Sequence, residues 1–133
     1  MALPDGLTQS AFSQLLGCRV QSLEDGVAHV ALSLEPQLRN RAGKLHGGVL
    51  FSLVDISMGL ACSSTHGFDQ QSATIECKIN YIRAVAEGEV LCIAKVIHPG
   101  DARWSSKRML CRATSWSQKH KARSLSCSGQ RLI

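Results

Sequence analysis

The sequence lacks the marks of several large protein classes. No apolar run reaches the roughly 18 residues of a membrane-spanning helix, so we expect no transmembrane helix and no membrane partner. The opening residues, MALPDGLTQSAF, lack the basic and then apolar order of a secretory signal, which favours a cytoplasmic location. No Cys-x-x-Cys pair is present among the six cysteines. This predicts reduced, mostly buried thiols and argues against a zinc or thioredoxin-like site; we expect no metal and no cofactor.

Aromatic side chains are also scarce, at 5% of the chain. Positive charge is unevenly placed: residues 1–100 hold seven Lys/Arg and nine Asp/Glu, whereas residues 101–133 hold eight Lys/Arg and one Asp, a net +7. Such asymmetry favours an anionic partner, although a solvated basic face would give the same pattern. Nucleic acid is disfavoured because stacking platforms are few and no binding motif is recognisable.

The length of 133 residues predicts one domain, residues 1–133. The pattern predicts a short helix capped by Thr8 or Ser10, a strand or two, a polar loop, and one long, nearly all-apolar helix. Four long strands follow, with turn signals between them that favour successive antiparallel hairpins. The expected ranges are helix 8–16, strand 26–34, loop 35–46, a helix from Gly47 or Gly48 to about Ser63, and strands 71–82, 89–98, 103–116 and 122–133. This order predicts an α+β fold with a curved antiparallel sheet around the long helix.

The long helix carries a single carboxylate, Asp55, among apolar residues. At 100° per residue, Gly48, Ser52, Asp55 and Gly59 fall on one stripe about 60° wide. A buried, ionised carboxylate costs several kcal/mol unless it is paired or reached by water, so Asp55 is either half of an ion pair or a working group.

The helix begins with the sequence His46-Gly47-Gly48. Unpaired backbone N–H groups at a helix N-terminus bind anions or stabilise a developing oxyanion. Gly48 and Asp55 lie about 10 Å apart along the axis at 1.5 Å per residue, too far for one helix to offer both to one carbonyl. Two helices from two copies of the chain would bring them together, which predicts a homodimer with sites between chains.

Four segments together resemble the hotdog-fold acyl-CoA thioesterases, and among them the phenylacetate-degradation (PaaI-like) subgroup. They are Asn40, Leu45-His46-Gly47-Gly48, Leu53-Val54-Asp55 and the segment INYIRA at 79–84. The resemblance runs from about residue 10 to 130. It implies a long helix wrapped by an antiparallel sheet, an acyl-CoA substrate, and a homodimer or a dimer-of-dimers tetramer.

The resemblance also implies roles for individual residues. Asp55 corresponds to the family's acidic residue, as nucleophile or as the base that activates water, and Gly47 to the residue whose N–H polarises the thioester carbonyl. His46 and Asn40 correspond to residues that hold the thioester or the loop around it. Alternation along its strand places Thr74 on the polar face and Tyr81 on the other face. Thr74 corresponds to a Ser or Thr beside the carboxylate in the family. Ala84 departs from the family, where many relatives have proline.

The mouth of such a site would hold the phosphates of coenzyme A, for which Arg83 corresponds to a basic family position. Arg103, Lys107 and Arg108 are further candidates because they lie on the basic segment. Gly48 and Ser52, on the small-residue stripe, are candidate substrate contacts. The alternatives are a non-catalytic acyl-CoA-binding hotdog domain, a hotdog dehydratase, whose motifs are missing, and a nucleic-acid binder. No Gly-x-Ser-x-Gly is present, which argues against an α/β-hydrolase.

Overall fold

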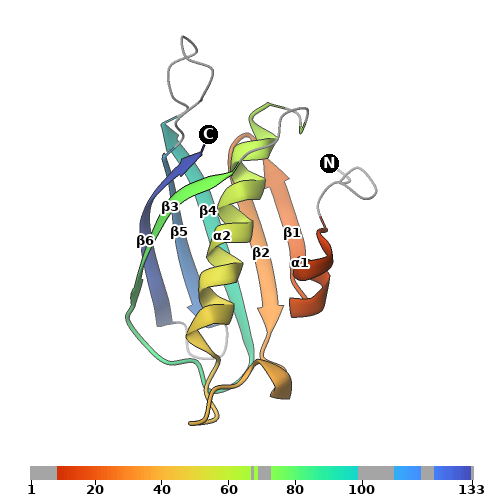
Figure 1. The fold of residues 1–133 in the computed structure, drawn as a ribbon, viewed down its shortest axis with the longest axis vertical. Helices are drawn as coiled ribbons and strands as arrows, with labels where there is room; N and C mark the ends of the chain where they lie inside the picture. Colours follow the sequence, from red (N-terminus) through yellow and green to blue (C-terminus); the bar gives the residue numbers. More distant parts are fainter. Residues whose placement is uncertain (1–8, 67, 69–72, 99–109, 118–121, 133) are drawn as a thin grey trace.

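In the computed structural model, which describes residues 9–66, 68, 73–98, 110–117 and 122–132, one long helix lies across a curved antiparallel sheet (Figure 1). The predicted α+β architecture is therefore confirmed. The elements are α1 Ala11–Leu16, β1 Arg19–Glu24, β2 Val27–Ser33, the 3₁₀ turn η1 Pro36–Leu38, α2 Gly47–Ser64, β3 Thr74–Tyr81, β4 Glu89–His98, β5 Leu110–Ser117 and β6 Ala122–Leu132.

The short helix α1 begins and ends where capping chemistry places its ends. The Ser10 side chain accepts a hydrogen bond of 3.1 Å from the Ser13 N–H, so Ser10 and not Thr8 is the N-cap. Gly17 ends the helix at φ 72°, a left-handed conformation that glycine adopts at little cost.

The sheet order is β1-β2-β4-β5-β6-β3, which confirms the expected antiparallel neighbours β4–β5 and β5–β6 and corrects the expected hairpin between β3 and β4. β3 pairs with β6 and not with β4. The reason lies before the helix: β2 pairs with β4 from Val27–Lys95 to Ser33–Glu89, and β5 pairs with the other side of β4. With both edges of β4 taken, β3 becomes the edge strand on the far side of the sheet, beside β6 (Figure 1).

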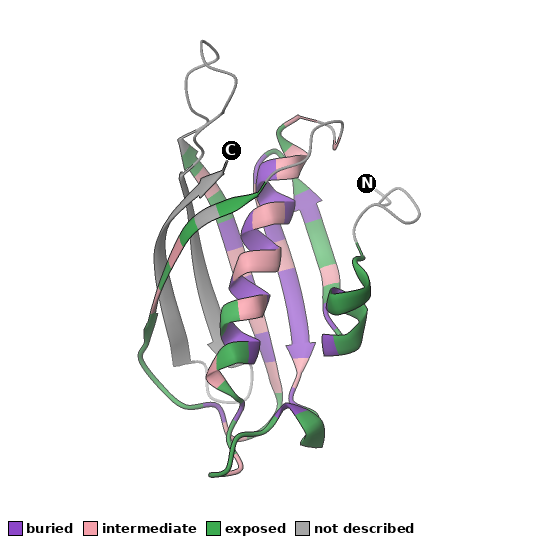
Figure 2. Ribbon diagram, viewed as in Figure 1, coloured by how far each residue is buried: buried purple, intermediate pink, exposed green. Residues whose placement is uncertain are grey.

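The helix α2 supplies much of the core. Leu53, Val54 and Met58 are fully buried and pack with Val30, Leu32 and Val90 of the sheet. The stripe is less buried: Gly48 is exposed, and Ser52, Asp55 and Gly59 are half-buried. Figure 2 shows exposed and half-buried segments alternating with buried ones along α2. The predicted small-residue stripe is therefore the outer face of α2. By length and composition alone α2 could also cross a membrane, with a mean hydropathy of 1.4, but core helices share these properties.

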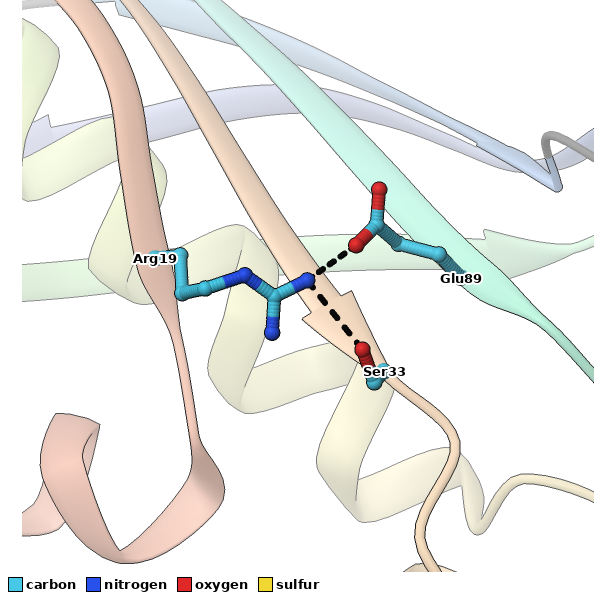
Figure 3. Close-up of polar contacts among 3 residues, drawn as sticks. All are labelled: Arg19, Ser33 and Glu89. Carbon is cyan, nitrogen blue, oxygen red and sulfur yellow. Dashed lines mark hydrogen bonds and ion pairs between the residues drawn. The ribbon is translucent and has the colours of Figure 1, made fainter.

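Polar contacts also join the three neighbouring strands β1, β2 and β4. The Arg19 guanidinium bonds to the Glu89 carboxylate and, over 3.1 Å, to the Ser33 hydroxyl (Figure 3). Among the cysteines with described side chains, Cys18, Cys62 and Cys92 are buried and Cys77 is half-buried, and none of these four forms a disulfide. The expectation of buried thiols holds for the first three.

The edge strand β3 carries an irregularity that bears on the site. Between Thr74 and Glu76, two steps along β3 match one step along β6, from Leu132 to Arg131, so β3 contains one extra residue there. Such a bulge reverses the alternation of faces along the strand. As a result Thr74 and Tyr81 both contact α2, and the expectation that they lie on opposite faces is wrong.

Candidate active site

The first turn of α2 is built around His46. The His46 Nδ1 atom accepts a hydrogen bond of 2.9 Å from the Gly48 N–H, so His46 is the N-cap of the helix. A nitrogen that accepts a backbone N–H carries no proton of its own, so neutral His46 bears its hydrogen on Nε2. The His46 side chain is exposed.

One backbone N–H group in the first turn of α2 has no described hydrogen-bond acceptor. The Gly48 N–H is taken by His46 Nδ1, and the N–H groups of Val49 and Leu50 reach the His46 carbonyl at 3.0 and 3.3 Å. The Gly47 N–H has no acceptor among the described residues. It therefore projects an unsatisfied donor at the positive end of the α2 dipole.

Gly47 lies in the wall of a pocket of about 260 Å³ at the start of α2. Two cationic side chains, Lys44 and Arg83, line the same pocket, so its surroundings favour an anion. The remaining lining residues are Asn40, Leu45, Leu50, Tyr81, Ile82 and Ala84.

Asn40 shapes the loop beside this pocket. Its Oδ1 accepts hydrogen bonds from the Ala42 N–H at 2.9 Å and the Lys44 N–H at 3.1 Å, and its own N–H reaches the Lys44 carbonyl at 2.7 Å. These bonds hold residues 40–44 in a tight turn, an arrangement that Asn favours. The Arg39 guanidinium joins this turn to the loop between β3 and β4 by bonding to the carbonyls of Gly43 and Ala86.

Tyr81 closes the pocket from the end of β3. Its hydroxyl donates a hydrogen bond of 2.9 Å to the Gly47 carbonyl. Its ring covers Gly47 so closely that a Cβ added there would lie 3.4 Å from Cε1 and Cζ. Desolvation, with a smaller contribution from nearby Cys77, raises the pKa of Tyr81 above its usual value of 10.0, so the hydroxyl keeps its proton at neutral pH.

Asp55 and Thr74 form a separate group two turns further along α2. The Thr74 hydroxyl donates to Asp55 Oδ1 over 2.6 Å, which joins the first residue of β3 to the outer face of the helix. Asp55 is half-buried. Its carboxylate therefore meets solvent as well as a hydrogen-bond donor, which is compatible with a charged group.

The predicted site residues thus fall into two groups within one chain. Asn40, Gly47 and Arg83 share the pocket, and His46 lies beside them. Asp55 lies eight residues after Gly47, about 12 Å along the helix at 1.5 Å per residue, and Thr74 of β3 is bonded to it there. Of the candidate substrate contacts, Gly48 has its N–H bonded to His46, and Ser52 donates its hydroxyl to the Gly48 carbonyl at 2.8 Å. Arg103, Lys107 and Arg108 lie outside the described residues.

Two residues with polar side chains in the pocket lie outside the predicted site. Lys44 directly precedes the Leu45-His46-Gly47-Gly48 segment, a position that could have been flagged as basic beside a helix N-terminus. Tyr81 was assigned only by strand alternation, and no sequence signal announced its bond to Gly47.

Comparison with known proteins identifies the relatives of this chain. A model of the thioesterase superfamily matches residues 42–106, which include the start of α2 and Asp55. The acyl-coenzyme A thioesterase PaaI of Escherichia coli K12 is 34% identical over 91 residues, covering 68% of this chain and 63% of that enzyme. The matched regions span 56, 61 and 63% of the length of three curated relatives.

Solved structures extend the likeness over nearly the whole chain. The conserved protein PA5202 from Pseudomonas aeruginosa is 47% identical, with a TM-score of 0.86, covering 98% of this chain and 100% of that chain. The PaaI protein of the E. coli phenylacetic acid degradation operon, 23% identical, has the same fold, with a TM-score of 0.79 over 92% of this chain and 83% of that one.

Proposed function

Because the chain belongs to the thioesterase superfamily, with a PaaI-like hotdog fold, we propose that it hydrolyses an acyl-CoA or aryl-CoA thioester to a free acid and coenzyme A. The observation that carries the proposal is the Gly47 N–H, a backbone donor left without a described acceptor in a pocket lined by Lys44 and Arg83.

The Gly47 amide is suited to polarise the thioester carbonyl. As the carbonyl carbon is attacked, negative charge develops on its oxygen, and a fixed donor at a helix N-terminus stabilises that charge more than it stabilises the ground state. Glycine allows the carbonyl to approach the backbone closely. Removing one such donor typically costs a factor of about 10² in kcat.

Asp55 completes the chemistry by one of two routes. As a nucleophile, its carboxylate forms a bond to the carbonyl carbon, the C–S bond breaks, and the CoA thiolate leaves; water then hydrolyses the resulting anhydride. As a general base, it takes a proton from water while the water oxygen attacks the same carbon, and the thiolate again leaves. The Thr74 hydroxyl fixes the carboxylate through its bond to Oδ1 in either route.

The complete site is proposed to lie between two chains. Within one chain Asp55 and Gly47 are about 12 Å apart along α2, too far for both to act on one carbonyl. Two α2 helices packed antiparallel about a two-fold axis would place Asp55 of one protomer near Gly47 of its partner, giving two equivalent sites. A homodimer is therefore the minimal proposed assembly, and a dimer-of-dimers tetramer would retain the same sites.

Coenzyme A fits the electrostatics of the pocket. Its pyrophosphate and 3′-phosphate are anions, and Arg83 and Lys44 line the pocket beside the amide that would face the thioester. Arginine offers paired N–H donors to phosphate, whereas lysine acts as a point charge. A non-catalytic acyl-CoA-binding domain would keep these cations, but it would not require the Asp55–Thr74 pair on the outer face of α2.

A panel of acyl-CoA thioesters, scored by release of free thiol, tests the proposal. We expect turnover of at least one acyl class by the wild-type chain and a loss of 10²-fold or more in kcat for Asp55→Asn, which removes the charge and keeps the shape. If the wild-type chain binds acyl-CoA but turns over no thioester in the panel, the non-catalytic alternative is established. A folded Asp55→Asn variant with wild-type kcat would remove Asp55 from the mechanism.

Single-turnover hydrolysis in H₂¹⁸O detects a nucleophilic Asp55. With enzyme in excess over thioester, a nucleophilic Asp55 acquires ¹⁸O when its anhydride is hydrolysed at the aspartyl carbon, and the peptide that contains Asp55 then gains mass. An unlabelled peptide with ¹⁸O in the acid product is the result for a general base or for an anhydride hydrolysed at its acyl carbon, so only a labelled peptide decides between the routes.

A further inference from the structure

Nearly every polar atom of the two peptide groups that flank Gly47 forms a hydrogen bond. The carbonyl of the His46–Gly47 peptide accepts from the N–H groups of Val49 and Leu50. The Gly47–Gly48 peptide is held at both ends: its carbonyl accepts from the Tyr81 hydroxyl at 2.9 Å and its N–H donates to His46 Nδ1 at 2.9 Å. Among the described residues, the one polar group of these two peptides without a partner is the Gly47 N–H.

We propose that Tyr81 is a positioning residue for the Gly47 amide: its hydroxyl bonds to the Gly47 carbonyl and its ring packs on Gly47, which together restrain the first turn of α2. The inference rests on the thioesterase activity proposed above and adds to it a residue with no assigned role. Tyr81 touches the carbonyl side of Gly47 and not the amide itself, so it acts through the backbone and not on the reacting atoms.

The start of α2 needs such a restraint because it consists of glycine residues. Two consecutive glycines begin the helix, and glycine has the widest range of backbone conformations of any residue. The first turn of a helix also frays most readily, since its N–H groups lack intrahelical partners. An oxyanion donor is effective only when its direction is fixed before the reaction. A bond from another element of the fold supplies that fixation, and β3 brings Tyr81 to this point.

The hydrogen bonds of Tyr81 and His46 are connected in series through the Gly47–Gly48 peptide. The Tyr81 O–H donates to the Gly47 carbonyl, the N–H of the same peptide donates to His46 Nδ1, and His46 keeps its proton on Nε2. Hydrogen bonds arranged in this way polarise one another, so each strengthens the next. Loss of the Tyr81 hydroxyl therefore weakens the His46 cap as well as the hold on Gly47. The ring packing on Gly47 remains when only the hydroxyl is removed.

Tyr81→Phe tests the inference because it deletes the hydroxyl and keeps the ring. We expect kcat to fall about fivefold, the effect of losing one neutral hydrogen bond, while KM for acyl-CoA changes less than twofold. Thr65→Val is the matched control: it deletes a hydroxyl that donates to a carbonyl, that of Cys62, at the other end of the same helix. The control should keep wild-type kcat. Tyr81→Phe with wild-type kcat in an active enzyme would overturn the inference.

A second measurement separates this inference from the proposed function. In ¹⁵N-labelled protein without substrate, Tyr81→Phe should move the amide resonances of Gly47 and Gly48 and the ¹⁵N resonances of the His46 ring, whereas Thr65→Val should leave them in place. If the wild-type chain turns over no thioester, the proposed function fails, and moved resonances still establish Tyr81 as the restraint on this turn. Unmoved resonances overturn the inference whether or not the enzyme is active.

Discussion

The Thr74 hydroxyl lies 2.6 Å from Asp55 Oδ1, so the first residue of an edge strand restrains the one carboxylate on the long helix. This bond links two residues that are nineteen positions apart in the sequence. A donor on a carboxylate stabilises its charged form and limits its rotation. Thr74 is therefore the natural place to test how far the orientation of Asp55 contributes to turnover.

Thr74→Val should lower kcat about tenfold, because a hydrogen bond to a charged group is worth more than a neutral one. Thr74→Ser keeps the hydroxyl and should keep most of the activity. Steady-state kinetics on one acyl-CoA substrate compares the three proteins. Equal kcat values for Thr74→Val and the wild type would show that the bond is structural only.

Mixed dimers test the placement of the site between chains. Asp55→Asn removes the carboxylate and Gly47→Pro removes the amide hydrogen, so each homodimer should be inactive. In a heterodimer of the two, one site carries both defects and the other carries neither, so about half of the wild-type activity per dimer should return.

The control for this experiment is a dimer of two differently tagged Asp55→Asn chains, purified in the same way, which should stay inactive. Purified mixed dimers without activity would mean that each site is built within one chain, provided that both variants fold and exchange subunits.

Neutralising the pocket cations should weaken substrate capture more than chemistry. Arg83→Gln and Lys44→Gln should each raise KM for acyl-CoA several-fold with little change in kcat, because their charges are proposed to act on the phosphates of coenzyme A and not on the reacting carbonyl. KM should also rise with salt, as exposed charges are screened. A short thioester without the nucleotide should respond to neither change; equal sensitivity of that substrate would show that the cations support the fold.

Stability should decline at alkaline pH through Cys18. Burial raises the pKa of its thiol above the usual 9.0, against smaller opposing effects of the Ser13 hydrogen bond and the Arg19 charge. The unfolded chain loses this proton near pH 9 and the folded chain only at higher pH. The free energy of unfolding should therefore fall by about 1.4 kcal/mol per pH unit from pH 9 upward until the folded pKa is reached.

Urea denaturation between pH 7.5 and 10.5 measures this loss. Cys18→Ala should show a flatter dependence on pH, at a lower stability near neutral pH because of the cavity it leaves. Identical slopes for the variant and the wild type would assign the alkaline loss to other groups.

The sequence predicted the features that depend on local pattern. The span of α2, the Ser10 or Thr8 cap of α1, and the small-residue stripe around Asp55 all follow from helical periodicity and capping chemistry. The helix start at Gly47 is confirmed, and the structure adds that the stripe holding Asp55 is only partly buried; the catalytic roles of both residues stay predictions.

Features that depend on pairing at long range could not be read from the pattern. Turn signals between β3 and β4 suggested a hairpin, but β2 had already taken the edge of β4 that β3 would need. Strict alternation along residues 71–82 hid the bulge, since an extra residue is apparent only when the partner strand is known. For the same reason the contact between Tyr81 and Gly47 had no sequence signal.

The bulge between Thr74 and Glu76 makes the length of β3 more consequential than its composition. A substitution within the strand alters one contact. Loss of the extra residue at the bulge would leave Thr74 and Tyr81 six positions apart, and strict alternation would then still place both on the face that contacts α2. Loss of one residue between Glu76 and Tyr81, with the bulge kept, would instead place Thr74 and Tyr81 on opposite faces, so that only one of them could contact α2. A single in-frame codon deletion there could thus uncouple the two halves of the site without removing any residue that belongs to either.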